Sequence, residues 1–380
     1  MENKFRLKKF LATASAFAMI TSASSSAMGA RITTAGGNVA ALRDGNGASL
    51  SAPFTSGADH IRLGGGHDIA TGGNIVLVGG GFEANGNAGQ TLTVGHDVTI
   101  GDGVGDVEMN VVLNAGNFNI GTNDVTEDAT INGGQFTARD ITGAGAGNGD
   151  LTVTGGTAVV RSVTRNVTLT NGADVTSTGT VGGTLGVANN AIFKGAAGAT
   201  DVAGAVTINT NNAGMNTMRD STGAALTVTK GNLTMRNHTH ASDVTLTAGT
   251  LTMGNAARDL LVNGGQVVSA GTVARDLTAT NGVVTTVGNV TRNVDLSNGA
   301  DVTSTGTVGG TLDVADDAIF KGDAGATDVA GAVTIDTNNE GMNTMRDSTG
   351  AALTVTKGNL TMRNHTHASD VTLTAGTLTM

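Results

Sequence analysis

The chain has 380 residues, 59 of them glycine, with a formal charge of −10 and no cysteine, tryptophan or tyrosine. Aromatic residues make up only 2% of the chain, which disfavours a large globular enzyme, since such cores are normally filled by leucine, isoleucine and aromatic rings. The absence of cysteine excludes disulfides and thiolate metal sites, and the acidic balance argues against a nucleic-acid partner.

Residues 1–30 have the three zones of a secretory signal peptide. Basic residues come first, an apolar run covers 10–20, and small residues follow to Ala30. The run is too short for a membrane anchor, which needs about 20 apolar residues. We expect export, with cleavage near Ala27–Gly29, and we expect residues 31–60 to form the N-terminal cap region of the folded part, residues 61–380.

Residues 164–253 recur as residues 291–380, with eight differences in 90 positions. Seven of the eight changes introduce a carboxylate in the second copy, and carboxylates are tolerated best where they face water. We therefore expect these positions on the outer surface: Asp295, Asp313, Asp316, Asp317, Asp323, Asp336 and Glu340.

A shorter repeat lies inside the long one. The segments 226–235 and 244–253 share a frame of two short alternating strands around a glycine bend. Similar frames recur about every 17 or 18 residues, which is too short for a unit that buries its own apolar face. The first apolar residues of these frames are Ile61, Ile75, Leu92, Val111, Ala129, Leu151, Val167, Leu185, Val206, Leu226, Val244, Leu260, Leu277, Val294, Leu312, Val333, Leu353 and Val371.

These frames predict an all-β fold, a parallel β-helix (β-solenoid) with about 17–18 residues per turn and roughly 18 turns. Alternate small apolar side chains would fill a narrow interior, and the backbone of each turn would pair with the turns on either side. Aspartate and asparagine suit the turn positions because their short side chains bond nearby backbone groups. The predicted structural turn positions are Asp140, Asn166, Asp243, Asp259, Asp276, Asn293 and Asp370.

Candidate metal ligands are few. His238 and His240, with their copies His365 and His367, are spaced at i and i+2, which puts both imidazoles on one face of an extended strand. No third ligand follows at a fixed spacing, and a surface loop explains the pattern more simply. We therefore predict no metal and no cofactor.

Two glycine-rich fragments, 65–68 and 101–106, are similar to pieces of the calcium-binding nonapeptide of RTX β-rolls, with Asp102 and Asp106 as candidate ligands. A calcium-binding secreted protein is therefore one alternative. A secreted β-helix enzyme acting on polysaccharide is another, and it would need carboxylates or a basic residue gathered on one face. The acidic residues are spread over many turns instead, so no catalytic residue is assigned and an enzyme is not expected.

The whole chain resembles the passenger regions of autotransporter surface antigens, particularly the rickettsial surface-cell-antigen group. The signal segment and the sequence Ala-Gly-Thr-Leu-Thr-Met at 248–253 and 375–380 carry this resemblance. It implies a right-handed parallel β-helix, display at the cell surface or outer membrane, and a role as adhesin or structural stalk.

The resemblance also implies partners on the host-cell surface or in the extracellular matrix. Membrane attachment would come only through a C-terminal barrel outside this sequence. Met380 aligns with Met253, after which the first copy continues. We therefore expect a chain truncated before its barrel, whose gene continues with a sequence such as Gly-Asn-Ala-Ala-Arg-Asp. The ligand and the oligomeric state are left open.

Overall fold

The computed structural model describes eight short strands between Ile32 and Ile100 together with residues 106–380, apart from short gaps. The gaps are 109, 144–146, 196–200, 213, 222–224, 236–238, 241, 270, 282, 323–327, 340–341, 349–351 and 363–368. The chain divides into two compact units: residues 1–183 with 190–193, and residues 184–189 with 194–380. The predicted signal peptide, residues 1–30, lies outside the described residues.

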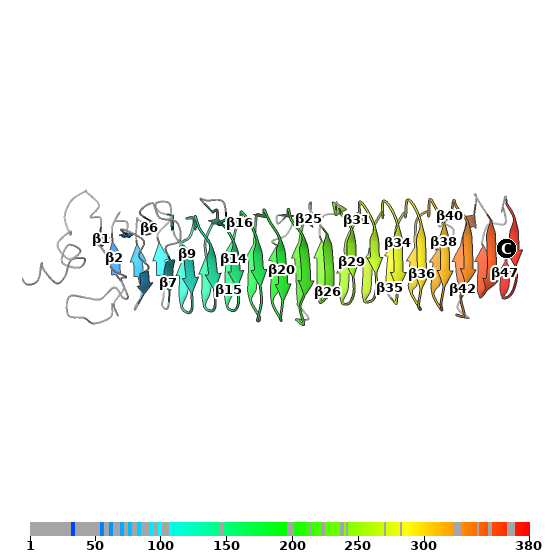
Figure 1. Cartoon of the computed structure of the whole chain (residues 1–380), viewed down its shortest axis with the longest axis horizontal. Coiled ribbons are helices and arrows are strands. Elements are labelled where there is room, and N and C mark those ends of the chain that lie inside the picture. The colour runs from blue at the N-terminus through cyan, green and yellow to red at the C-terminus, as the bar shows by residue number, and fades with distance from the viewer. Residues whose placement is uncertain are drawn as a thin grey trace, which may run out of the picture. The chain divides into compact units, whose positions relative to one another are not determined.

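The predicted β-solenoid is confirmed. Within the described residues there is no helix, and the strands stack in parallel on the equivalent strands of neighbouring turns (Figure 1). Each full turn has a strand in a first sheet, a strand in a second sheet, and a strand or single bridging residue in a third sheet. Alternation of apolar and polar residues produces this arrangement, because successive side chains of a strand point to opposite faces.

The first unit shows the three sheets over consecutive turns. Its first sheet contains β4 (Ile69–Thr71), β7 (Thr91–Val94), β9 (Asn110–Leu113), β11 (Ala129–Ile131), β14 (Leu151–Val153) and β17 (Val167–Leu169). Its second sheet contains β2 (Phe54–Ser56), β5 (Ile75–Leu77), β8 (Val98–Ile100), β10 (Asn117–Asn119), β12 (Gln135–Thr137), β15 (Thr157–Val160) and β18 (Asp174–Ser177). Its third-sheet strands are β1 (Ile32–Thr34), β3 (Ile61–Leu63), β6 (Phe82–Ala84), β13 (Asp140–Ile141), β16 (Ser162–Val163) and β19 (Thr180–Val181).

The predicted number of turns, 18, is too high, because the described first-sheet strands number 17. Part of the error lies near the N-terminus, where Ile61 begins a third-sheet strand and Ile75 a second-sheet strand. The first-sheet partner of Leu92 is Ile69. Short alternating segments look alike in the sequence whichever sheet they join. Of the predicted cap region, residues 31–60, only β1 and β2 are described, and both pair in parallel with later strands.

The second unit repeats the pattern. Its first sheet contains β20 (Leu185–Ala188), β23 (Val206–Asn209), β26 (Leu226–Lys230), β29 (Val244–Leu246), β32 (Leu260–Val262), β34 (Leu277–Thr280), β36 (Val294–Ser297), β38 (Leu312–Ala315), β41 (Val333–Asp336), β44 (Leu353–Lys357) and β46 (Val371–Leu373). Its second sheet contains β24 (Met215–Met218), β27 (Asn232–Met235), β30 (Thr250–Thr252), β33 (Gln266–Ser269), β35 (Val283–Val287), β37 (Asp301–Ser304), β39 (Ile319–Gly322), β42 (Met342–Met345), β45 (Asn359–Met362) and β47 (Thr377–Thr379). β21 (Ile192–Gly195) is a second-sheet strand with residues in both units.

The third sheet of the second unit is thinner. It consists of β22 (Asp201–Val202), β25 (Asp220–Ser221), β28 (Thr239–His240), β31 (Asn255–Ala256), β40 (Asp328–Val329) and β43 (Asp347–Ser348). Between Ala256 and Val329 it narrows to single bridging residues, Val273, Val290 and Val308. A single inward residue per turn is enough to close this side of the interior.

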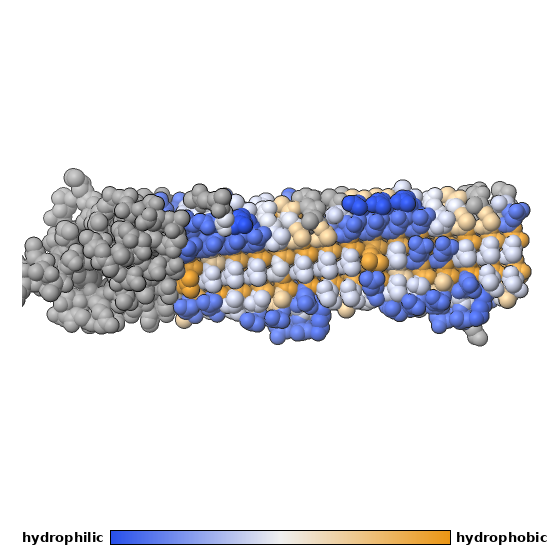
Figure 2. Space-filling model, viewed as in Figure 1, coloured by the Kyte–Doolittle hydropathy of each residue, from blue (hydrophilic) through white to orange (hydrophobic). Residues whose placement is uncertain are grey.

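Among the residues whose burial is described, the interior is filled mainly by valine, leucine and alanine, and most strands between β9 and β45 bury alternate residues. In the part of the chain whose burial is described, four phenylalanines are fully buried, and Phe118 stacks on Phe136 with ring centroids 5.3 Å apart. The outward residues also form rows, because register pairs equivalent positions of neighbouring turns. Bands of similar hydropathy therefore run across the strands on the face shown in Figure 2.

Bends between the first and second sheets use residues with positive φ. Gly249 has φ +93°, and a Cβ there would strike the backbone oxygen of Gly231 in the preceding turn. The bend of the first copy at Asn189 and Asn190 has φ of 47° and 67°, and its equivalent in the second copy, Asp316 and Asp317, has 45° and 66°. Asparagine and aspartate are the side chains that best tolerate this left-handed region.

Candidate functional site

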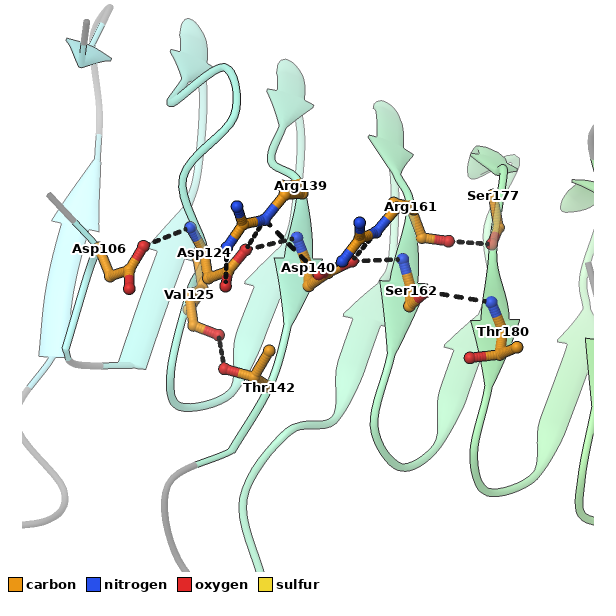
Figure 3. Close-up of polar contacts among 10 residues, drawn as sticks. All are labelled: Asp106, Asp124, Val125, Arg139, Asp140, Thr142, Arg161, Ser162, Ser177 and Thr180. Atoms are coloured by element: carbon orange, nitrogen blue, oxygen red, sulfur yellow. Dashed lines mark hydrogen bonds and ion pairs between the residues drawn. The ribbon is translucent and has the colours of Figure 1, made fainter. Parts of the chain in front are cut away.

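Polar side chains gather where the chain enters the third sheet, and in the first unit they form a ladder from turn to turn (Figure 3). The N–H of Asp124 donates to Asp106 Oδ1 at 2.9 Å, and the N–H of Asp140 donates to Asp124 Oδ1 at 3.2 Å. Ser162 N donates to Asp140 Oδ1 at 3.0 Å, and Thr180 N donates to Ser162 Oγ at 3.1 Å. We call Asp106, Asp124, Asp140 and Ser162 the third-sheet ladder.

Two arginines complete this ladder. Arg139 donates from Nε and Nη2 to the two oxygens of Asp124, at 2.8 Å and 2.6 Å. Arg161 binds Asp140 in the same two-point way. The pKa of Arg139 is raised, first by its hydrogen bond to Asp124 and then by the charge of that carboxylate. Both carboxylates are nearly buried, so their charge is balanced within the corner itself.

A second ladder runs along the corner just before the first-sheet strands. In the first unit the N–H of Asp128 donates to Asn110 Oδ1 at 3.2 Å, and the N–H of Asp150 donates to Asp128 Oδ1 at 2.9 Å. Asn166 donates from its N–H and from Nδ2 to Asp150 Oδ1, at 2.9 Å and 3.0 Å. Arg165 Nη1 lies 3.5 Å from Asp150 Oδ2. We call this series the first-sheet ladder.

The first-sheet ladder recurs in the second unit over Asp243, Asp259, Asp276 and Asn293. The N–H of Asp259 donates to Asp243 Oδ1 at 3.4 Å, and the N–H of Asp276 donates to Asp259 Oδ1 at 3.1 Å. The N–H of Asn293 donates to Asp276 Oδ1 at 3.0 Å. Each carboxylate therefore accepts a backbone bond from the turn that follows it.

An arginine from the following turn accompanies each of these three carboxylates. The ion pairs are Arg258 Nε to Asp243 Oδ1 at 3.2 Å, Arg275 Nε to Asp259 Oδ1 at 3.4 Å, and Arg292 Nη1 to Asp276 Oδ2 at 3.4 Å. The two residues of each Arg-Asp or Arg-Asn dipeptide thus have different roles at the corner. The arginine neutralises the carboxylate of the preceding turn, while the next residue bonds that carboxylate through its N–H and carries the ladder on.

One predicted turn residue lies in unexpected surroundings. Asp140 does not precede a first-sheet strand; it begins β13 and is 5% exposed, in the third-sheet ladder. Asp370 is exposed and precedes β46, and its backbone oxygen accepts the N–H of Leu353 at 2.9 Å. The remaining predicted turn positions, Asn166, Asp243, Asp259, Asp276 and Asn293, all belong to the first-sheet ladder.

The candidate metal ligands do not come together in the described part of the chain. His240 is fully buried in β28, in the row of inward residues that continues with Ala256, and not in a surface loop. Asp243 lies at the exposed corner with Arg258. Asp106 is an acceptor in the third-sheet ladder. The other four candidates, His238, His365, His367 and Asp102, lie outside the described residues.

Among residues 106–380, gaps excepted, no group of three or more histidine, aspartate or glutamate side chains could hold a metal ion. The described residues also include no helix long and apolar enough to cross a membrane. A partly buried acid, Glu127, was not singled out from the sequence. Burial, followed by the charge of Asp128, raises its pKa, and Asn148 Nδ2 donates to its Oε2.

The carboxylates that distinguish the second copy are exposed wherever the structure describes them, as expected from the sequence. Asp295 and Asp313 are register partners on the outer face of the first sheet. Burial, followed by the charges of Asp313 and Asp276, raises the pKa of Asp295. Glu340 and Asp323 lie outside the described residues.

Comparison with known proteins identifies no relative: the chain matches no protein-family model, no curated protein and no solved structure.

Proposed function

We propose that this chain is an exported, surface-exposed passenger of the autotransporter type, acting as a structural stalk or an adhesin-like surface. The signal-like zones of residues 1–30 support export. The β-solenoid supports an extended display surface, because such folds need only backbone ladders and a thin apolar interior. The host-cell surface or the extracellular matrix would supply its partner.

This proposal rests on where the two copies, residues 164–253 and 291–380, agree in sequence and where they differ. The two copies are identical at every inward position and every ladder residue that the structure describes, whereas the five described new carboxylates are all exposed. The ladder carboxylates accept hydrogen bonds from backbone N–H groups and form ion pairs with arginines of the next turn. These carboxylates therefore have a structural role. A surface that accepts new charges while the frame stays fixed suits display better than a fixed chemical site.

Export can be tested with residues 1–30 fused to a leaderless alkaline phosphatase, which is active only outside the bacterial cytoplasm. We expect activity from the natural segment. Phe17→Arg, in the apolar run, should reduce activity roughly tenfold or more, since a central arginine costs about 2.5–3.5 kcal/mol in an apolar segment. Asn3→Arg, in the basic zone, is the matched control and should keep full activity. A fusion that stays inactive while the protein accumulates would refute export.

The role at the surface is tested separately with purified residues 31–380 applied to cultured animal cells. Saturable binding that unlabelled protein displaces would identify an adhesin. Binding that only rises in proportion to concentration would leave the stalk role.

A further inference from the structure

We propose that residues 164–290 form an exchangeable cassette of whole solenoid turns, which the chain can lose or gain without breaking a strand ladder or a corner ladder. Seven first-sheet strands begin within it: β17, β20, β23, β26, β29, β32 and β34. The next, β36, opens the second copy. The inference concerns the chain's architecture and does not depend on the proposed function.

The two ends of the cassette occupy the same place in a turn. Thr164 follows the inward third-sheet residue Val163, and its N–H donates to Ile141 O at 2.9 Å. Thr291 follows the inward third-sheet residue Val290. Its N–H donates to the backbone oxygen of the bridging valine in the preceding turn, at 2.9 Å. A junction between Val163 and Thr291 would therefore continue a third-sheet residue into its usual corner.

The corner contacts at the two ends also match. Arg165 and Asn166 bind Asp150 of the preceding turn, and Arg292 and Asn293 bind Asp276. After loss of the cassette, Asp150 would meet an arginine and an asparagine in the same order. The first-sheet ladder would then run through the junction with its charges balanced.

The strand contacts at the junction would match as well. Leu151, Thr152 and Val153 now pair with β17, and after the loss they would pair with β36. β36 has the same inward residues as β17, because the only difference between Val167–Leu169 and its copy is the outward change from Thr168 to Asp295. The shortened chain would equal residues 1–253 with eight substitutions, and those that the structure describes keep the inward residues unchanged.

Cross-linking tests the register of the junction, because the natural chain has no cysteine. In a chain lacking 164–290, Thr152→Cys and Asp295→Cys would be direct neighbours on adjacent strands, about 4.8 Å apart, within the range of a disulfide. The full-length chain with Thr152→Cys and Thr168→Cys is the positive control, since these two residues are register partners. A chain lacking 164–273 is the register control, because it would place Thr278 rather than Asp295 beside Thr152.

We expect the chain lacking 164–290 to keep the β-sheet circular dichroism per residue of the full chain and to form the disulfide as completely as the positive control. The full-length chain and the register control, both carrying Thr152→Cys and Asp295→Cys, should form little intramolecular disulfide. An unfolded shortened chain would overturn the proposal. A folded shortened chain whose two cysteines fail to cross-link would overturn it equally, since its strands would then be in another register.

Discussion

The two copies, residues 164–253 and 291–380, show which positions the fold controls and which it leaves free. Their inward residues are the same in sequence, and so are the arginines and acids of their corners, although the inward residues Val371 and Leu373 of the second copy's last turn are exposed. The copies differ by one methyl group, which Thr170 has and Ser297 lacks, and by seven carboxylates in the second copy. Five of these carboxylates are described, and all five are exposed. In a stacked fold an inward residue contacts two neighbouring turns, whereas an outward residue on a sheet face contacts mainly water.

The largest expected effects test whether the two interiors are equivalent. Phe193 and its copy Phe320 are both fully buried. Phe193→Ala and Phe320→Ala should each lower the free energy of unfolding by about 3–5 kcal/mol through lost transfer energy and a cavity. Urea unfolding, read by far-ultraviolet circular dichroism, measures both. Because the surrounding sequences match, the two costs should agree; a clear difference would show that the copies pack differently inside.

A medium effect is expected at the corners that open the two copies. Asp150→Ala and Asp276→Ala each leave the N–H of Asn166 or Asn293 without its acceptor and an arginine without its counter-ion. Each should cost about 1–3 kcal/mol. Asp→Asn at the same positions keeps an acceptor oxygen and should cost less. Faster amide hydrogen exchange at Asn166 or Asn293 would locate the damage; equal costs for alanine and asparagine would mean that the backbone bond contributes nothing.

The smallest expected effect concerns Asp295, one of the carboxylates that distinguish the second copy from the first. Burial and the charges of Asp313 and Asp276 raise the pKa of Asp295, so the folded chain holds this proton more tightly than the unfolded chain. Stability is therefore lost as the pH rises from the ordinary value of 3.8 through the raised pKa, and the loss persists at neutral pH. Asp295→Thr, which restores the residue of the first copy, should stabilise the neutral protein by ~0.2–1 kcal/mol, and less at high salt, because the site is partly exposed.

Urea unfolding of the natural chain and of Asp295→Thr, from pH 3 to pH 7, measures this effect. The two stabilities should converge at the acidic end. Thr168→Asp in the first copy is the matched control: it should carry a smaller penalty, because the first copy has Gly186 at the position equivalent to Asp313, the acid that pairs with Asp295. Parallel pH profiles for the natural chain and Asp295→Thr would contradict the assignment.

Much of the fold follows from sequence, and the failures have physical causes. Alternating residues around glycine bends predict the parallel stack, because small apolar side chains at that spacing can be buried only between turns. The number of turns could not be obtained in the same way, since a strand such as β3 or β5 has the same alternation whichever sheet it joins. His240 lies in a strand of two residues, which is too short to show any alternation, so its burial could not be foreseen.

The corner ladders could be predicted only in part. Aspartate and asparagine before the strands suggest turns, but their arginine partners lie 15 to 21 residues away along the chain, as for Arg139 with Asp124 and Arg161 with Asp140. This distance becomes a contact only when the length of each turn is known. The sequence signal that could have revealed it is the recurrence of an arginine about one turn after each corner carboxylate.

The direction of these ion pairs matters while the polypeptide is being made. The guanidinium that neutralises each of these three carboxylates is synthesised about one turn later, so a growing chain that ends at such a corner carries an acid that is not yet neutralised. Such an end attracts water and repels the like end of a neighbouring nascent chain.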